Sequence, residues 1–400
     1  MSTATQKVPL LHALTPAAES SRSDTLRYHH LEPTVAKYAP TDTSRWREFL
    51  AAEPGSLEEV SVARQLANLY MLMGLQALHQ TITPESATLW SERYTDASTQ
   101  IYSVPSGEVA RNLEVDGFEP SRELYEIAEQ MRDYLYSEYA DVFACTDEAT
   151  LPEFLSPRDV KQVFQDVLQT LSDHHDTDWR EWSVVVDNTK DSLSVSGKSK
   201  QIIIGGKRRD MPREELHGLI AHEVLVHAQC SLNGHKVSEL LGTGLPGYLE
   251  AEEGLGMLME FALTGKIPQK MIDRYTDIAY ALGELDGAAH TRQETLERAI
   301  VREQKRSPER SLQDIEDIVY PHVNRIYRGS LGNEHIAVFT KDIAYYNGFM
   351  ETAAYFAQAR QHNIPIAETM KFRLGGCFNP SDQTHCDYIK THQKKAGGVH

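Results

Sequence analysis

The sequence predicts an α+β fold that is predominantly helical, with a small sheet directly before a buried helix. Short β-branched runs at 182–186, 193–195 and 201–204 are separated by polar turns, which is typical of strands. Apolar residues recur at helical spacing through most of the chain that follows residue 120. The 400 residues are enough for one large domain or two moderate ones with a substantial core.

Helices are expected both before and after the predicted strands along the chain. A capping box, Ser56-x-x-Glu59, begins one of them and is followed by an apolar face. The other predicted helices span 123–143, 157–171, 267–285, 288–305, 309–327, 341–361 and 366–373.

Residues 221–227, Ala-His-Glu-Val-Leu-Val-His, lie on an apolar helix whose start Asp210 is expected to cap. Burying two imidazoles and a carboxylate costs several kcal/mol unless each finds a partner, and one metal ion is a partner common to all three. However, His222 and His227 are five residues apart, so on a regular helix they diverge by about 140°. Either a π-bulge brings both rings to one ion, or the helix unwinds near Val226.

A third candidate donor is Glu253, which follows His227 by 26 residues (253 − 227) and comes after the turn-rich stretch 241–247. Zinc peptidases with two histidines and one glutamate leave the fourth coordination position open for water. Gly254 and Gly256 would allow the glutamate-bearing helix to approach the first helix closely. The alternative is that Glu253 and its neighbouring glutamates form a solvated face.

These motifs resemble those of the microtubule-associated tyrosine carboxypeptidases and of their bacterial relatives, which are named for a Gln-Glu-Gly-Leu-Ala motif. The family pattern is His-Glu-x-x-x-His, Asn-Gly, Glu-Glu-Gly-Leu-Ala or its Gln variant, and later Arg-Gly and Lys-Asp-x-x-Tyr-x-x-Gly segments. The matching residues, within about 180–360, are His222-Glu223-x-x-x-His227, Asn233-Gly234, Glu252-Glu253-Gly254-Leu255-Gly256, Tyr327-Arg328-Gly329 and Thr340-Lys341-Asp342-x-x-Tyr345-x-x-Gly348. The chain departs from the pattern in two places: Gly256 replaces the usual Ala, and Val-Leu-Val replaces the common Ile-Gly-Thr between the histidines.

The resemblance implies a zinc metallopeptidase with a zincin-like core and one Zn²⁺ per chain. By this resemblance His222, His227 and Glu253 would be the metal ligands, and Glu223 would be the catalytic base. We expect one continuous domain with a short segment at each end. Its parts are an extended or disordered arm at 1–45, an N-terminal helical part at 46–175, the zincin-like catalytic part at 176–390 and a tail at 391–400.

A carboxypeptidase also needs a donor for the oxyanion and a cation for the terminal carboxylate of its substrate. Tyr345, Tyr346 and Arg328 are candidate donors, and Arg328 and Lys341 are candidate cations, because all four lie in the family-like segments. As a candidate oxyanion donor, Tyr346 would also bind the substrate. The alternatives are an ordinary charge pair at a helix start for Lys341 and a surface salt bridge for Arg328. The basic run 205–209 either faces the cleft or is exposed to solvent in its turn, and we favour solvation, that is, exposure to solvent.

For three of the cysteines and for His217, an ordinary structural role is a simpler alternative to a role at the metal. Cys230 follows His227 closely, but we expect a buried free thiol, because Glu253 already completes a ligand set. Cys377 and Cys386 could pair, but a cytosolic chain usually keeps its cysteines reduced. His217 either orients a metal ligand or is a hydrogen-bonded core histidine.

Charge and hydropathy restrict the partners. The 40 basic and 58 acidic residues give a net charge of −18, which disfavours nucleic acid and anionic membranes. It also disfavours acidic peptides, so we expect a peptide or protein substrate other than the acidic tubulin tails on which characterised relatives act. No apolar run reaches the roughly 18 residues of a membrane span, and the N-terminus lacks the pattern of a signal peptide. A cytoplasmic protein is expected.

Three functions are consistent with the sequence. The first is a zinc carboxypeptidase that removes a C-terminal residue, an aromatic one being a candidate. The second is a zinc endopeptidase that matures a specific peptide, and the third is a non-catalytic regulator with a structural zinc. The presence of Glu223 argues against the third, since a structural site does not need a base. Dependence on a free terminal carboxylate would separate the first two.

Overall fold

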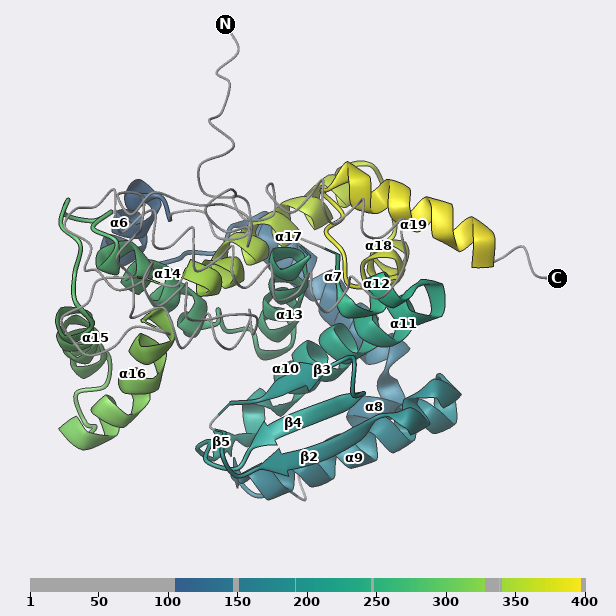
Figure 1. The fold of residues 1–400 in the computed structure, drawn as a ribbon, viewed down its shortest axis with the longest axis horizontal. Helices are drawn as coiled ribbons and strands as arrows, with labels where there is room; N and C mark the ends of the chain where they lie inside the picture. Colours follow the sequence, from purple (N-terminus) through teal and green to yellow (C-terminus); the bar gives the residue numbers. More distant parts are fainter. Residues whose placement is uncertain are drawn as a thin grey trace, which may run out of the picture. The chain divides into compact units, whose positions relative to one another are not determined.

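A computed structural model describes residues 105–146, 151–190, 192–245, 248–327, 338 and 340–396. These residues are predominantly helical and contain two small sheets, which confirms the predicted α+β class (Figure 1). The predicted arm at 1–45 and the helix after Ser56 lie outside the described residues. No helix in the described part of the chain is both long and apolar enough to cross a membrane.

The chain forms two compact units. Unit 1 consists of Met1–Gly117 and Lys270–Ile343, and unit 2 consists of Phe118–Gln269 and Ala344–His400. The expected parts 46–175 and 176–390 of one continuous domain stay a prediction, and each contributes residues to both units.

Unit 1 is helical in its described residues, and a buried carboxylate joins three of its helices. Its elements are α6 (Gly107–Val115), α14 (Gln269–Ala281), α15 (Arg292–Arg306), α16 (Leu312–Ile326) and η6 (Thr340–Asp342). Asp277 on α14 is fully buried and accepts hydrogen bonds from Arg302 of α15 (2.7 Å) and His322 of α16 (3.0 Å). Burial alone would raise the pKa of Asp277, but the charges and hydrogen bonds of Arg302 and His322 together outweigh burial and lower the pKa.

Unit 2 contains both sheets, and the predicted strands are confirmed to within one or two residues. The three-stranded sheet has the order β2 (Ser183–Asp187), β4 (Gln201–Gly205), β3 (Ser194–Ser196). Strand β2 runs parallel to β4, with Val184 opposite Ile202, whereas β3 runs antiparallel to β4 and forms one edge. A second, smaller sheet pairs β1 (Phe154–Leu155) with β5 (Met211–Pro212).

The longer helices of unit 2 also follow the prediction closely, and the short helices η3 and α12 are additions, as is α19. They are α7 (Arg122–Glu138), α8 (Ala140–Ala144), α9 (Pro157–His174), η3 (Thr177–Glu181), η4 (Arg213–Glu215), α10 (Leu216–His222), η5 (Glu223–Ala228), α11 (Gln229–Val237), α12 (Glu239–Thr243), α13 (Leu249–Thr264), α17 (Ile343–Gln361), α18 (Ile366–Arg373) and α19 (Gln383–Ala396). The sequence analysis did not predict α19. Helix α9 packs on β2 and β4, while η5 contacts β3 and β4, so the sheet is flanked by helices (Figure 1).

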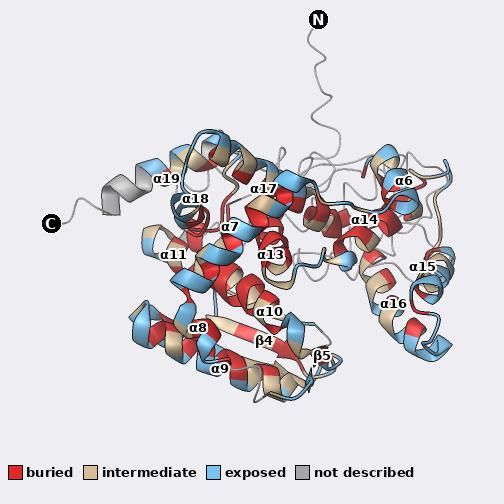
Figure 2. Cartoon of the chain, turned by 180° about the vertical axis from the view of Figure 1, so that it is seen from behind, coloured by how far each residue is buried: buried red, intermediate tan, exposed pale blue. Residues whose placement is uncertain are grey.

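The core of unit 2 is centred on α13, which is buried along most of its length (Figure 2). Helix α13 packs against α10 on one side, and it meets α17 at two glycines. A Cβ atom on Gly254 would overlap the carbonyl of Gly348, and a Cβ atom on Gly348 would overlap the carbonyl of Glu250. The glycines therefore let the two helix backbones touch, which fixes the position of α13.

Candidate metal centre

The helix that carries both histidines contains a π-helical segment, η5, between α10 and α11. His222 is the last residue of α10 and His227 lies in η5. Because π-helical hydrogen bonds join residues five apart, this segment returns His227 to the face of His222. Of the two alternatives left open by the sequence, the structure therefore has the π-bulge.

The start of this helix differs from the prediction. Asp210 does not cap it, because Met211 and Pro212 pair with Leu155 and Phe154 in the smaller sheet. The helix begins after a 3₁₀ turn, Arg213–Glu215, without a side-chain cap. The local capping signal is overridden here by strand pairing with a distant segment.

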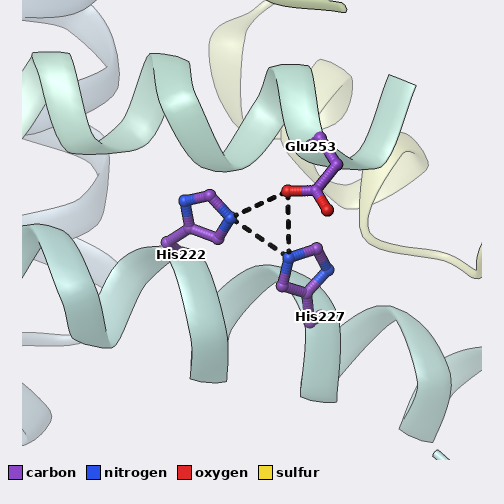
Figure 3. Close-up of side chains that lie close together, drawn as sticks. All are labelled: His222, His227 and Glu253. Carbon is purple, nitrogen blue, oxygen red and sulfur yellow. Dashed lines mark hydrogen bonds and ion pairs between the residues drawn. The ribbon is translucent and has the colours of Figure 1, made fainter. Parts of the chain in front are cut away.

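Three donor atoms converge where α10, η5 and α13 meet (Figure 3). Nε2 of His222 lies 3.1 Å from Nε2 of His227 and 3.3 Å from Oε2 of Glu253. The distance from Nε2 of His227 to the same oxygen is 3.6 Å. Ligands about 2.0–2.1 Å from a tetrahedral zinc ion would lie about 3.3 Å from one another. The spacing and the donor types therefore fit one zinc ion.

Two further carboxylates orient the rings. Nδ1 of His222 lies 2.7 Å from Oε1 of Glu260, and Nδ1 of His227 lies 2.6 Å from Oε1 of Glu252. A carboxylate that accepts the Nδ1 proton leaves the Nε2 lone pair directed at the centre, which is the arrangement common to metal-binding histidines.

The sequence analysis missed both of these partners. It placed Glu252 among glutamates that could form a solvated face, although Glu252 is buried. A usable signal was present for Glu260: it follows Glu253 by seven residues (260 − 253), which is two helical turns on the same face.

The three donors are strongly coupled electrostatically. Burial alone would lower the pKa of His222, but its bonds to Glu253 and Glu260 outweigh burial and raise the pKa to about 9. Burial alone would raise the pKa of Glu253, yet the two imidazoles hold it well below its usual range. The three side chains are thus stabilised by ion pairs with one another, and a bound cation would take the place of the shared protons.

Gly256, where the family usually has Ala, lies against the ring of His222. A Cβ atom at this position would be 2.7 Å from Nε2 and Cδ2 of that ring, closer than real contacts allow. This departure from the family pattern therefore lets the His222 ring lie directly on the backbone of α13.

Glu223 is half-buried and follows His222 at the start of η5. Its charge acts to raise the pKa of both His222 and Arg208, so all three groups lie within electrostatic range of one another. Arg208 belongs to the basic run 205–209, for which we favoured solvation. The structure divides that run, because Lys207 and Arg209 are exposed whereas Arg208 is partly buried.

The remaining predicted site residues are not members of the donor cluster. Arg328 lies outside the described residues. Lys341 is in η6 of unit 1, beside the buried Asp342. On α17, Tyr345 is half-buried, and the buried Tyr346 ring meets Phe118 edge-on at 6.3 Å. Their catalytic and substrate-binding roles stay predictions.

The other candidates follow the simpler interpretations. His217 is hydrogen-bonded to the hydroxyls of Tyr136 (3.1 Å) and Thr146 (3.0 Å), as a core histidine would be. Cys230 is a buried free thiol, and Cys377 and Cys386 are also free.

A model of the microtubule-associated tyrosine carboxypeptidase family matches residues 92–372, which is more than half of the chain. The chain belongs to this family. The matched region contains both histidines and Glu253, so it includes the whole cluster of donors. A carboxypeptidase family implies a peptide or protein substrate. A comparison with individual curated proteins gives no match.

Proposed function

We propose that this protein is a zinc-dependent carboxypeptidase with a zincin-like core. One Zn²⁺ per chain would be held by His222, His227 and Glu253, and the enzyme would remove a C-terminal residue from a peptide or protein. The observation that carries the proposal is the convergence of three zinc-type donors next to Glu223, a carboxylate that is adjacent in sequence but is not one of the three.

Glu223 is the proposed general base. A bound zinc ion would supply Lewis-acid activation of water and of the scissile carbonyl. Glu223 would accept the proton of the attacking water and pass it to the leaving amine. Glu252 and Glu260 would keep both imidazoles oriented during this cycle, because each accepts the Nδ1 proton of one ring.

The sheet offers a place for the substrate backbone. Strand β3 is at the edge of its sheet, and it contacts η5, which carries His227. An extended peptide that pairs with β3 would therefore run past the donor cluster, in the manner of strand addition. Since the chain carries a net charge of −18, we infer a substrate that is not strongly acidic, and an aromatic terminal residue is our first choice.

The test compares wild type with Glu223→Gln, with Glu214→Gln at an exposed position near the start of the same helix as the control. Metal content is measured, and peptides that end in Tyr are supplied with free and with amidated C-termini. We expect about one zinc per chain in all three proteins, and cleavage of free C-termini by wild type and Glu214→Gln only.

The other possible outcomes each contradict a different part of the proposal. Absence of bound zinc would overturn the metal centre. Equal cleavage of amidated peptides would favour an endopeptidase that matures a specific peptide. Zinc binding without cleavage of either peptide would favour a regulator with a structural zinc.

A further inference from the structure

Arg208 has an environment that is unusual for a partly buried arginine. It lies in the turn after β4, where its backbone N–H donates to the carbonyl of Gly205 (3.2 Å). Its Nη1 atom is buried without a hydrogen-bond partner among the described residues. Its Nη2 atom has only a weak contact with the sulfur of Met211 at 3.9 Å. One nitrogen of the guanidinium is thus shielded from water without a hydrogen bond among the described residues.

Several other shielded arginines in the described part of the chain bond a carboxylate directly, and the buried Arg373 donates to the carbonyl of Ala251. Arg302 and Arg325, for example, each donate two hydrogen bonds to one buried aspartate. Arg208 instead interacts with Glu223 and Glu215 only electrostatically, without a hydrogen bond to either carboxylate among the described residues. A buried donor without an acceptor destabilises a fold, so such a group in a native protein calls for an explanation, and a bound ligand that accepts its hydrogen bond is one.

The position relative to Glu223 indicates what would bind. In a carboxypeptidase the scissile carbonyl lies beside the general base, and the terminal carboxylate is one residue further, about 4 Å away. That carboxylate would meet the negative charges of Glu223 and of the glutamates around the histidines. A cation within electrostatic range of Glu223 offsets this repulsion, and a guanidinium matches a carboxylate with two parallel hydrogen bonds.

We propose that Arg208 binds the terminal carboxylate of the substrate and thereby restricts cleavage to free C-termini. This inference rests on the proposed carboxypeptidase function, and it assigns to Arg208 the role that the sequence analysis gave to Arg328 and Lys341. Arg208 is a specificity-determining residue in this scheme, because it contacts the group that distinguishes a C-terminus from an internal peptide.

The test measures binding separately from catalysis. Zinc-loaded Glu223→Gln protein is titrated with acetyl-Gly-Gly-Tyr, with a free or an amidated C-terminus, in an isothermal calorimeter. Adding Arg208→Gln should weaken binding of the free acid by about 10- to 100-fold and leave binding of the amide unchanged. Arg209→Gln, an exposed neighbour in the same turn, is the matched control and should change neither. Arg208→Lys keeps the charge without the fork and should give an intermediate loss.

Kinetics in the wild-type background provide the second readout. Arg208→Gln should raise KM for the free acid far more than it lowers kcat, with unchanged zinc content. If Arg208→Gln binds the free acid as tightly as its parent, the assignment of Arg208 is wrong, although the carboxypeptidase proposal stands. If the wild type cleaves neither peptide, the proposed function itself fails. Should Arg208→Gln not fold, full-strength binding of the free acid by Arg208→Lys would equally overturn the bidentate contact.

Discussion

Glu250 makes the stability of this protein depend on pH. It lies in the first turn of α13, is 6% exposed, and has one carboxyl oxygen, Oε1, that is buried without a hydrogen-bond partner among the described residues. Burial and the nearby charge of Glu351 raise the pKa of Glu250 from 4.5 to about 8, although a hydrogen bond with Asn347 opposes the change. The folded protein therefore keeps this proton at neutral pH.

The sign of the effect follows from proton binding. Between pH 4.5 and 8 the unfolded chain releases the Glu250 proton while the folded chain retains it, so the free energy of unfolding falls as pH rises. The interval between the two pKa values corresponds to about 5 kcal/mol of the free energy of unfolding. This contribution is lost progressively as the pH rises to about 8. Glu250→Gln removes the titrating group and keeps its shape, so it should be more stable than wild type by about 4 kcal/mol at pH 8 and equal to it near pH 4.

Urea unfolding at a series of pH values from 4 to 8 measures this difference, and Glu129→Gln on the exposed face of α7 is the control. The wild type and the control should lose stability with rising pH more steeply than Glu250→Gln does. Parallel curves for wild type and Glu250→Gln would show that Glu250 is ionised in the folded protein, which refutes the reasoning.

Three other predictions concern the centre and the packing around it. Glu260→Gln removes the carboxylate that orients one imidazole and should weaken zinc binding by about 10- to 100-fold in a chelator competition, with the fold unchanged. Gly254→Ala places a methyl group on the Gly348 carbonyl, which no side-chain rotation relieves; thermal unfolding should show destabilisation of about 3 kcal/mol or more, and a wild-type melting temperature would contradict the close helix contact. Asp342→Ala leaves the charge of Arg325 without its bidentate partner in a largely buried site, so urea unfolding should show a loss of about 3 kcal/mol, and an unchanged midpoint would mean that the ion pair is not formed.

The sequence predicted most of the elements through local periodicity, and the convergence of His222, His227 and Glu253 through their motifs and the family resemblance that these carry. Strands β2, β3 and β4 are short β-branched runs between turns, and this pattern holds whatever they pack against. His222 and His227 were recognisable because their spacing demands either a π-bulge or a break, and Glu253 because it lies near the start of a helix that follows a turn-rich stretch. Each of these signals is local, and the family resemblance is what joined Glu253 to the histidines.

The parts that the sequence did not predict depend on distant contacts. Whether Glu252 and Glu260 face water or the imidazoles depends on the rotation of α13 about its axis, which contacts with α10 and α17 fix. Arg208 lies in a turn, where no periodicity distinguishes a buried side chain from its exposed neighbours. The start of α10 was placed too early for the same reason. Met211 and Pro212, which follow the expected cap Asp210, pair with β1 and do not enter the helix.

The π-helical segment separates the spacing of the two histidines in the sequence from their positions in space. Deleting one residue between the histidines would restore regular α-helical winding and give a four-residue spacing, so the ring positions alone do not require the extra residue. Because the π-helical segment absorbs that residue, the deletion would leave α11 at nearly the same rotation about the helix axis. Gly234 on α11 would keep its contact with the carbonyl of Leu241, where a Cβ atom has no room. A one-residue deletion in this segment is therefore a change that the packing of α11 can accept.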